Sequence, residues 1–159
     1  MKSRDLSKRV YTYRLDGNGR WHYGKNPVTD PDLARDFFAG LQQEPDGSWS
    51  FLCEGERCRA VVEDVPQFVE RLEAVTSPDG GALEAVGLVL GSGTSEMLDP
   101  GTLRSGTGGA LYCTLKSGQS ARFHRLPQLE LARWVSEEAD GAAVLRIAGR
   151  SFPVTDEKQ

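Results

Sequence analysis

The 159-residue chain is predicted to adopt an α+β fold: an antiparallel β-meander with one packed helix, followed by a smaller β-rich second half. Three observations support this prediction. Aromatic and polar residues alternate on both sides of a glycine turn, and a capped apolar stripe follows at 29–41. The second half then consists of short runs rich in small and β-branched residues, separated by glycine turns. Hydrophobic residues form 38% and charged residues 26% of the chain, as in globular proteins.

The first hairpin is predicted from residues 11–15 and 21–23, in which aromatic or apolar residues alternate with polar ones. Between them, Asp-Gly-Asn-Gly at 16–19 accepts positive φ values at low cost, which is typical of a hairpin turn. Because successive side chains of a strand point to opposite faces, Tyr13 and Trp21 are expected on one face and His22 on the other.

A helix is predicted next, because Asp30 supplies a capping side chain and Pro31 suits the first turn. Its apolar stripe, which includes Phe37, Phe38 and Leu41, is expected to pack on the aromatic face of the sheet. A second hairpin, from 49–51 and 59–62, is expected to turn through Glu-Gly-Glu at 54–56.

Two later segments fit both kinds of secondary structure. Residues 65–75 match a helical face, but Pro66 and the β-like run after it permit a strand. Residues 127–138 are predicted as a helix, although their leucines also alternate as on a strand. The chain closes with a predicted hairpin of 144–147 and 150–154 around Ala-Gly.

The clearest break in the pattern is Ser-Pro-Asp-Gly-Gly at 77–81, which is predicted to separate two subdomains. The expected organisation is a disordered N-terminus (1–9), an α+β subdomain (10–76), a β-rich subdomain (82–155) and a tail (156–159).

Short motifs along the chain resemble the domain-of-unknown-function 4505 family, which includes an uncharacterised mitochondrial protein of animals and bacterial relatives. The likeness extends over residues 9–154, nearly the whole chain. The motifs that carry it are residues 11–16, 37–41, 53–57, 63–66, 91–93, 109–112 and 148–150, together with Pro100.

A weaker likeness is to a bacterial group, the domain-of-unknown-function 1285 family. It rests on residues 19–23, the helix with Phe37 and Leu41, and residues 56–57, 63–66 and 152–154. This resemblance implies an α+β first half, a smaller β-rich second half, and a strand, not a helix, at 67–75. Neither family has an established activity, so the resemblance sharpens the expected fold and leaves the function open.

Charge and cysteine content narrow the classes of partner and compartment. The net charge is −4 without a basic cluster, so no nucleic-acid partner is expected. The basic start of the chain has no apolar run behind it, and no apolar run is long enough to span a membrane; no membrane partner is expected. Three cysteines without a secretion signal favour a reducing compartment, so the predicted location is the cytoplasm.

The candidate binding site is the acidic hairpin at residues 54–64. From this hairpin we select Glu56, Arg57, Glu63 and Asp64, and we add His22 from the first hairpin. Paired carboxylates beside an arginine can serve acid–base chemistry or bind a cation. A solvated turn with cross-strand ion pairs is the structural alternative, in which Asp64 holds the turn before Pro66.

The cysteines are interpreted as structural residues. Cys53 and Cys58 have the spacing C-x4-C, but no second paired motif completes a four-ligand zinc site. We therefore predict no metal and no cofactor. The expected function is that of a non-enzymatic binding or interaction protein with a small ligand or a protein partner. The alternative is a hydrolase or metal-assisted enzyme that uses acidic residues of the 54–64 hairpin; the sequence leaves the oligomeric state open.

Overall fold

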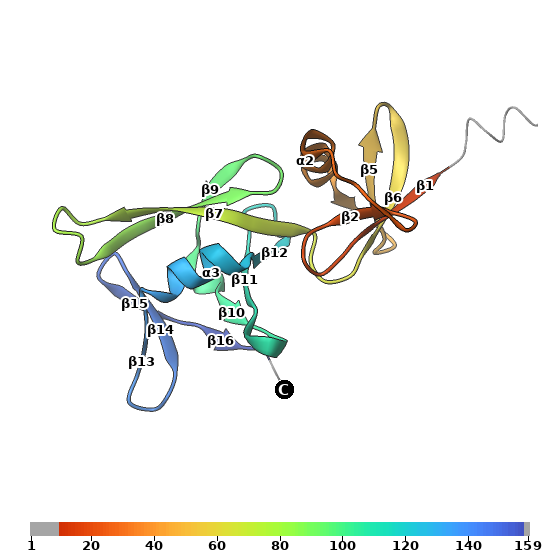
Figure 1. Ribbon diagram of the computed structural model, residues 1–159. Coiled ribbons are helices and arrows are strands. Elements are labelled where there is room, and N and C mark those ends of the chain that lie inside the picture. The colour runs from red at the N-terminus through yellow and green to blue at the C-terminus, as the bar shows by residue number, and fades with distance from the viewer. Residues whose placement is uncertain (1–9, 158–159) are drawn as a thin grey trace, which may run out of the picture. The chain divides into compact units, whose positions relative to one another are not determined.

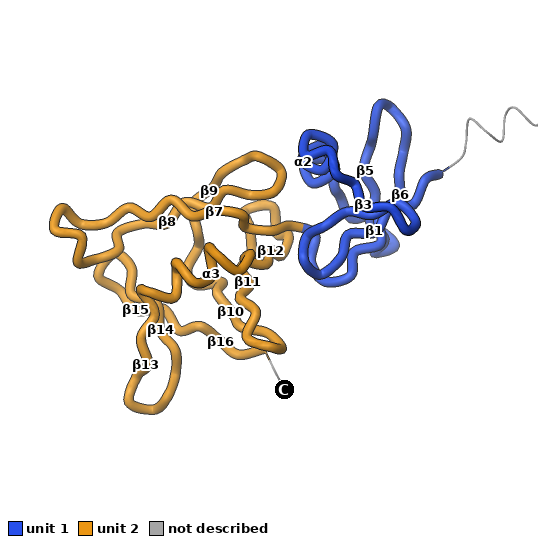
Figure 2. Tube along the Cα trace, in the orientation of Figure 1, with its two compact units in different colours: residues 1–66 blue, residues 67–159 orange. Residues whose placement is uncertain are grey.

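The division of the chain into two units is the main feature of the computed structural model, which describes residues 10–157 (Figure 2). Unit 1 comprises residues 1–66 and unit 2 residues 67–159. The break lies earlier than the predicted one at 77–81, because that segment is a hairpin turn, in which Ser77 N–H donates to Ala82 O at 2.8 Å. Glycine–proline signals mark tight turns and linkers alike.

The two ends of the predicted organisation are only partly within this structure. The predicted disorder of residues 1–9 lies outside the described residues. Of the predicted tail at 156–159, Asp156 instead belongs to a strand, and residues 158–159 lie outside the described range.

In its described part, unit 1 contains a six-stranded sheet in the order β3-β2-β1-β6-β5-β4 (Figure 1). Its elements are β1 (Tyr11–Leu15), β2 (Trp21–Tyr23), β3 (Asn26–Pro27), α2 (Pro31–Gly40), β4 (Gln42–Gln43), β5 (Trp49–Cys53) and β6 (Glu56–Val62). Both predicted hairpins are present, as β1–β2 and β5–β6.

The α+β class is confirmed, but the sheet of unit 1 is not an antiparallel meander. Strands β1 and β6 pair in parallel, with Tyr11 opposite Cys58 and Leu15 opposite Val62. A meander places sequence neighbours side by side, whereas here β2, β3, α2, β4 and β5 come between the two central strands, β1 and β6, in the sequence. The resulting sheet is mixed.

Helix α2 begins where the sequence predicts. The Asp30 carboxylate accepts from Asp32 N–H at 2.9 Å, and Pro31 occupies the first turn. The buried side of the helix presents Phe37 and Phe38 to the sheet, where Trp21 meets both rings edge-on, with centroids 5.3 and 5.5 Å away. The predicted packing of the helix on the aromatic face is therefore confirmed.

Unit 2 is the longer of the two, contrary to the predicted smaller second half. Its described residues form a seven-stranded sheet, β16-β10-β11-β12-β7-β8-β9, and a three-stranded sheet, β13-β14-β15. The elements are β7 (Gln67–Thr76), β8 (Leu83–Leu90), β9 (Ser95–Met97), η1 (Pro100–Thr102), β10 (Arg104–Ser105), η2 (Thr107–Gly109), β11 (Leu111–Thr114), β12 (Ser120–Phe123), α3 (Arg125–Ala132), β13 (Val135–Glu137), β14 (Ala143–Ile147), β15 (Arg150–Pro153) and β16 (Thr155–Asp156).

Both segments that fitted either a helix or a strand lie mainly in unit 2, and the structure shows which one each forms. Residues 67–76 form the long strand β7, as the family resemblance implied. The predicted helix at 127–138 is half right: α3 ends at Ala132, and β13 follows it. The closing hairpin is present as β14–β15.

A single apolar cluster joins the parts of unit 2. Leu131 of α3, Leu145 and Ile147 of β14, and Val69 of β7 are all buried in it. The small sheet and the helix thus cover one face of the large sheet, as layered packing requires. None of the helices in residues 10–157 is long and apolar enough to cross a membrane.

Candidate functional site

Two of the predicted site residues, His22 and Glu63, lie beside Arg14 on the sheet face of unit 1 opposite to α2. Alternation along β1 turns Tyr13 and Leu15 toward the helix, where the Tyr13 ring meets Phe37, and turns Arg14 outward. His22 of β2 stands directly opposite Arg14 in the register, so it shares the outward face.

A first polar group forms around Arg14. Its Nη1 lies 2.9 Å from Glu63 Oε2, which comes just after the end of β6. Beside it, His22 Nε2 lies 2.8 Å from Asp16 Oδ2 in the β1–β2 turn. The structure therefore brings two of the predicted residues, Glu63 and His22, to either side of an arginine that was not predicted.

Asp16 is the most tightly held member of this group. Burial by itself would raise the pKa of its carboxyl group, but hydrogen bonds from Arg20 N–H, His22 and Asn18 N–H outweigh that effect. The pKa of Asp16 therefore lies below its ordinary value. The carboxylate stabilises the turn in its charged form.

The other predicted residues lie elsewhere. Glu56 starts β6 opposite Cys53, whereas Glu63 follows the last residue of that strand. At about 3.3 Å per residue, this separates the two carboxylates by roughly 20 Å. Arg57 pairs with Glu44 instead, with 2.8 Å between Nη2 and Oε2, and Asp64 is an exposed residue beyond β6. The five predicted residues therefore do not meet in one place.

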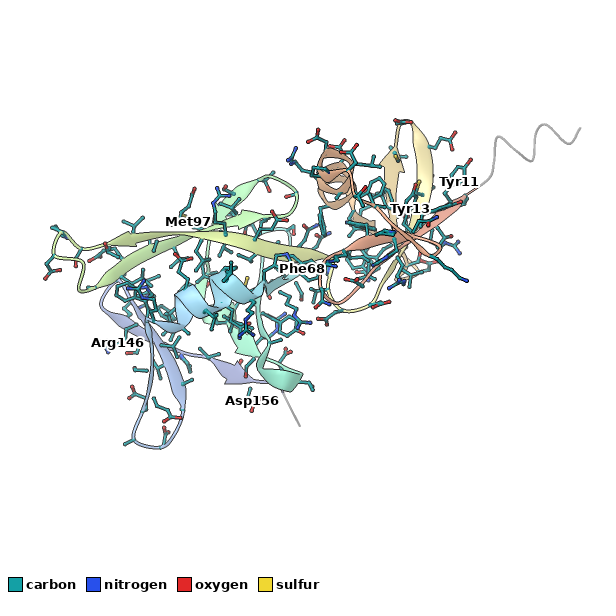
Figure 3. All side chains as sticks on the ribbon, in the orientation of Figure 1. Tyr11, Tyr13, Phe68, Met97, Arg146 and Asp156 are labelled. Atoms are coloured by element: carbon teal, nitrogen blue, oxygen red, sulfur yellow. The ribbon has the colours of Figure 1, made fainter. Side chains whose placement is uncertain are left out.

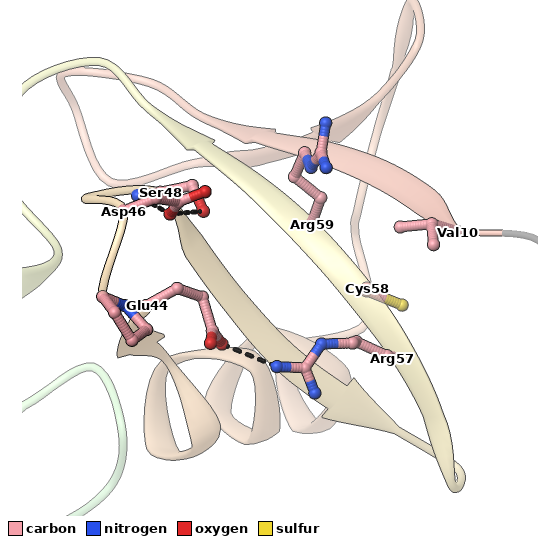
Figure 4. A pocket seen from close by; sticks show the side chains of 8 residues that line it. Val10, Glu44, Asp46, Ser48, Arg57, Cys58 and Arg59 are labelled. Carbon is pink, nitrogen blue, oxygen red and sulfur yellow. Dashed lines mark hydrogen bonds and ion pairs between the residues drawn. The ribbon is translucent and has the colours of Figure 1, made fainter.

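A surface depression of about 390 Å³ lies near Arg57, between β6 and the β4–β5 turn (Figure 4). Hydrogen bonds close this turn: Glu44 N–H donates to Ser48 O at 2.7 Å, and Gly47 takes a φ of 92° that favours glycine. Asp46 Oδ1 accepts from the amide and the hydroxyl of Ser48, at 2.9 and 2.6 Å. The depression is lined by Val10, Glu44, Pro45, Asp46, Ser48, Arg57, Cys58 and Arg59.

The charges of this depression differ in how they are engaged. A hydrogen bond from the Ser50 hydroxyl, with attraction to Arg57, holds the pKa of Glu44 below its ordinary value. The Ser48 hydroxyl and amide do the same for the pKa of Asp46, aided by the charge of Arg59. Among residues 10–157, the side chain of Arg59 has no hydrogen bond or ion pair.

Two residues of the depression were missed by sequence reasoning. Glu44 and Asp46 stand in a Glu-Pro-Asp-Gly turn, whose sequence signal marks the end of α2 and nothing more. Their place beside Arg57 and Arg59 follows from the pairing of β4, β5 and β6, which brings together residues far apart in the chain. No local pattern encodes that pairing.

The three cysteines are free thiols. Burial raises the pKa of Cys113 to about 12, and burial also raises the pKa of Cys53 and of Cys58. Within residues 10–157, no group of three His, Cys, Asp or Glu side chains is placed to hold a metal ion. The absence of metal and cofactor stays a prediction.

Comparison with known proteins supports the fold. No protein-family model matches the chain, and no curated protein does. A DUF1285 family protein from Silicibacter pomeroyi DSS-3 has a similar structure, with a TM-score of 0.70 and 21% identity over 92% of this chain and 80% of that one. A second, from Shewanella baltica OS155, has a TM-score of 0.56 and 20% identity over 78% of this chain and 92% of that one.

At these identities the likeness shows the fold alone. The weaker resemblance from the sequence motifs, to the domain-of-unknown-function 1285 family, is thus supported by structural neighbours. The stronger resemblance, to the 4505 family, is not shown by any of them.

Proposed function

We propose that the protein is a non-enzymatic cytoplasmic binding protein, and that the depression beside Arg59 takes a small anionic ligand. The observation that supports this most directly is which charged side chains of the depression already have a partner. Glu44 is engaged by Ser50 and Arg57, whereas the Arg59 guanidinium has its donors unused among the described residues.

A guanidinium in this position favours ligands with a carboxylate or phosphate group. Its planar donors match the oxygens of such groups in a two-pronged contact, and charge-assisted hydrogen bonds are stronger than neutral ones. The nearby Asp46 carboxylate attracts Arg59 and competes with the ligand. The expected affinity is therefore modest, and it falls as salt is added.

The cytoplasmic location is supported by the cysteines. None of Cys53, Cys58 and Cys113 forms a disulfide, as is usual where thiols are kept reduced. The enzymatic alternative, a hydrolase using Glu56, Glu63 and Asp64, has weaker support, because strand β6 holds Glu56 and Glu63 far apart.

Titration calorimetry at low ionic strength tests this site, with inorganic phosphate and succinate as probes. Arg59→Gln is expected to weaken binding about tenfold or more, since it removes the charged donor. Arg35→Gln is the matched control: Arg35 is an arginine on α2 that pairs with Asp32 and lies on the far side of the sheet. Equal binding by the Arg59→Gln variant and the parent would contradict the proposal.

A further inference from the structure

Unit 2 contains a second hollow, of about 250 Å³, between strands β8 and β9, the start of η1 and the β14–β15 hairpin. Its floor consists of core side chains, since Val86, Leu98 and Ile147 line it and are buried. Met97, labelled in Figure 3, and Phe152 add apolar surface nearer to solvent. The interior is thus suited to an apolar group.

The walls of this hollow are fixed by backbone hydrogen bonds. Ala148 N–H donates to Leu83 O at 2.8 Å and ties the hairpin turn to β8. On the other side, Leu98 N–H donates to Val86 O at 2.8 Å and fixes the segment after β9. A ligand that enters does not have to order its own site, which lowers the entropic cost of binding.

Two opposite charges line the otherwise apolar hollow. Glu84 of β8 is exposed, and so is Arg150 of β15, whose guanidinium lies over the Phe152 ring, 5.1 Å from its centroid. Neither charge forms a hydrogen bond or an ion pair within the described part of the chain. Both charges are therefore available to a ligand.

From this arrangement we propose that the hollow binds a free α-amino acid with an apolar side chain. The side chain occupies the apolar interior, the α-carboxylate pairs with Arg150 and the α-ammonium pairs with Glu84. This site lies in unit 2 and is independent of the anion site proposed for unit 1.

The chemistry of the hollow distinguishes this ligand from simpler ones. A carboxylic acid without an amine meets the repulsion of Glu84, and an amine without a carboxylate leaves Arg150 unmatched. A purely apolar group satisfies neither charge. The volume lies just below the range of about 300–1,000 Å³ that drug-sized ligands occupy, and so fits a smaller molecule.

Titration calorimetry of the full chain with L-phenylalanine, L-leucine and L-methionine tests the proposal. Dissociation constants on the order of 0.1–1 mM are expected for so small a ligand. Glycine, which has no side chain for the hollow, is expected not to bind. For 3-phenylpropanoate and 2-phenylethylamine, each of which lacks one charged group of phenylalanine, binding about tenfold weaker is expected.

Variants locate the site. Arg150→Gln and Glu84→Gln are each expected to weaken L-phenylalanine binding about tenfold or more, and Ala85→Leu, which fills the hollow, to abolish it. Arg146→Gln, which removes a nearby arginine that donates to Ser151 Oγ, is the control and should leave binding unchanged. Circular dichroism melting checks that each variant is folded.

Three results would overturn the proposal: no heat of binding with any of the apolar amino acids, 3-phenylpropanoate binding as tightly as L-phenylalanine, or full binding by folded Arg150→Gln protein. Arg59→Gln must leave L-phenylalanine binding intact. That result separates this site from the anion site of unit 1, so either proposal can fail without the other.

Discussion

The rings of Phe37 and Phe51 lie 4.3 Å apart between centroids, with their planes inclined by 40°, where α2 meets β5. Both side chains are buried, and Trp21 packs against each of them. This contact ties the helix to the sheet of unit 1.

Phe37→Ala is therefore expected to lower the free energy of unfolding by about 3–5 kcal/mol, because the deleted ring leaves a cavity. Urea denaturation followed by tryptophan fluorescence measures this, since Trp21 is part of the cluster. Leu129→Ala is the control: Leu129 of α3 is 53% exposed, and its removal should change stability by less than about 0.5 kcal/mol. If the Phe37→Ala protein has the same free energy of unfolding in urea as the parent, α2 does not pack as described.

The packing of α2 on the sheet could be predicted because the helix and the hairpins of unit 1 are each marked by residues close together in the sequence. A capping aspartate, a proline in the first turn and apolar residues at helical spacing define α2, and glycine turns define the hairpins of unit 1. Strand pairing between distant segments has no such signal. The parallel pairs β1–β6 and β12–β7 were not predicted for that reason.

The candidate site was less predictable than the fold. Arg57 was selected from the hairpin, but its partner Glu44 is 13 residues away, and Arg14 reaches Glu63 across 49 residues. Which charges meet depends on the order of strands in the sheet, and that order is a non-local property. Sequence reasoning could identify charged residues on exposed strand positions, but not their pairing.

The ion pair between Arg14 and Glu63 is expected to contribute little to stability. Both side chains are 42% exposed, and pairs in water gain little because solvent screens them. Glu63→Gln should change the free energy of unfolding by less than about 0.5 kcal/mol, measured by urea denaturation. A loss above about 2 kcal/mol would show that Glu63 has a structural role beyond this pair.

Because of Asp16, the stability of unit 1 should decrease as the pH falls into the acid range. Its folded-state pKa is depressed, so its contribution is fully present above the unfolded value of about 3.9 and is lost as pH falls through the folded value. At pH 7, Asp16→Asn should cost on the order of 1 kcal/mol. The difference between variant and parent in unfolding free energy should then vanish toward pH 2.

Asp32→Asn provides the matched control for this titration. Asp32 forms an ion pair with Arg35, but its side chain is 80% exposed. Its removal is expected to change the free energy of unfolding by less than about 0.5 kcal/mol, because solvent screens so exposed a pair. A pH profile of the Asp16→Asn variant that runs parallel to that of the parent would contradict the assignment to Asp16.

The three thiols should differ in their reactivity toward a disulfide reagent at pH 8. Cys53 is partly exposed, Cys58 is 2% exposed, and Cys113 is fully buried with a pKa of about 12. We expect Cys53 to react first and Cys113 only after denaturation, since the thiolate is the nucleophile and it must be accessible. Mass spectrometry of partially modified protein identifies the order; early labelling of Cys113 would contradict it.

Glycine is expected to be required at position 106, because a side chain there would collide with the ring of Tyr112. A Cβ at this position would lie 2.7 Å from Cε1 of Tyr112, closer than side chains pack. Gly106→Ala should therefore destabilise unit 2 by about 1–3 kcal/mol, measured by thermal unfolding. At Gly101 a Cβ would meet Asp99 Oδ1 at an ordinary 3.4 Å, so Gly101→Ala should cost less.

The parallel pairing of β1 with β6 has a consequence for biosynthesis. Each strand of the unit 1 sheet finds its neighbours within residues 11–62, so the complete set has left the ribosome while most of unit 2 is still to be made. In unit 2, by contrast, β10 pairs with β16, which follows every other described strand of that unit in the sequence. Folding of unit 1 during translation is therefore expected to precede that of unit 2. Strand β7 is made before β12, so the edge of β7 that pairs in parallel with β12 stays uncovered until β12 has been synthesised.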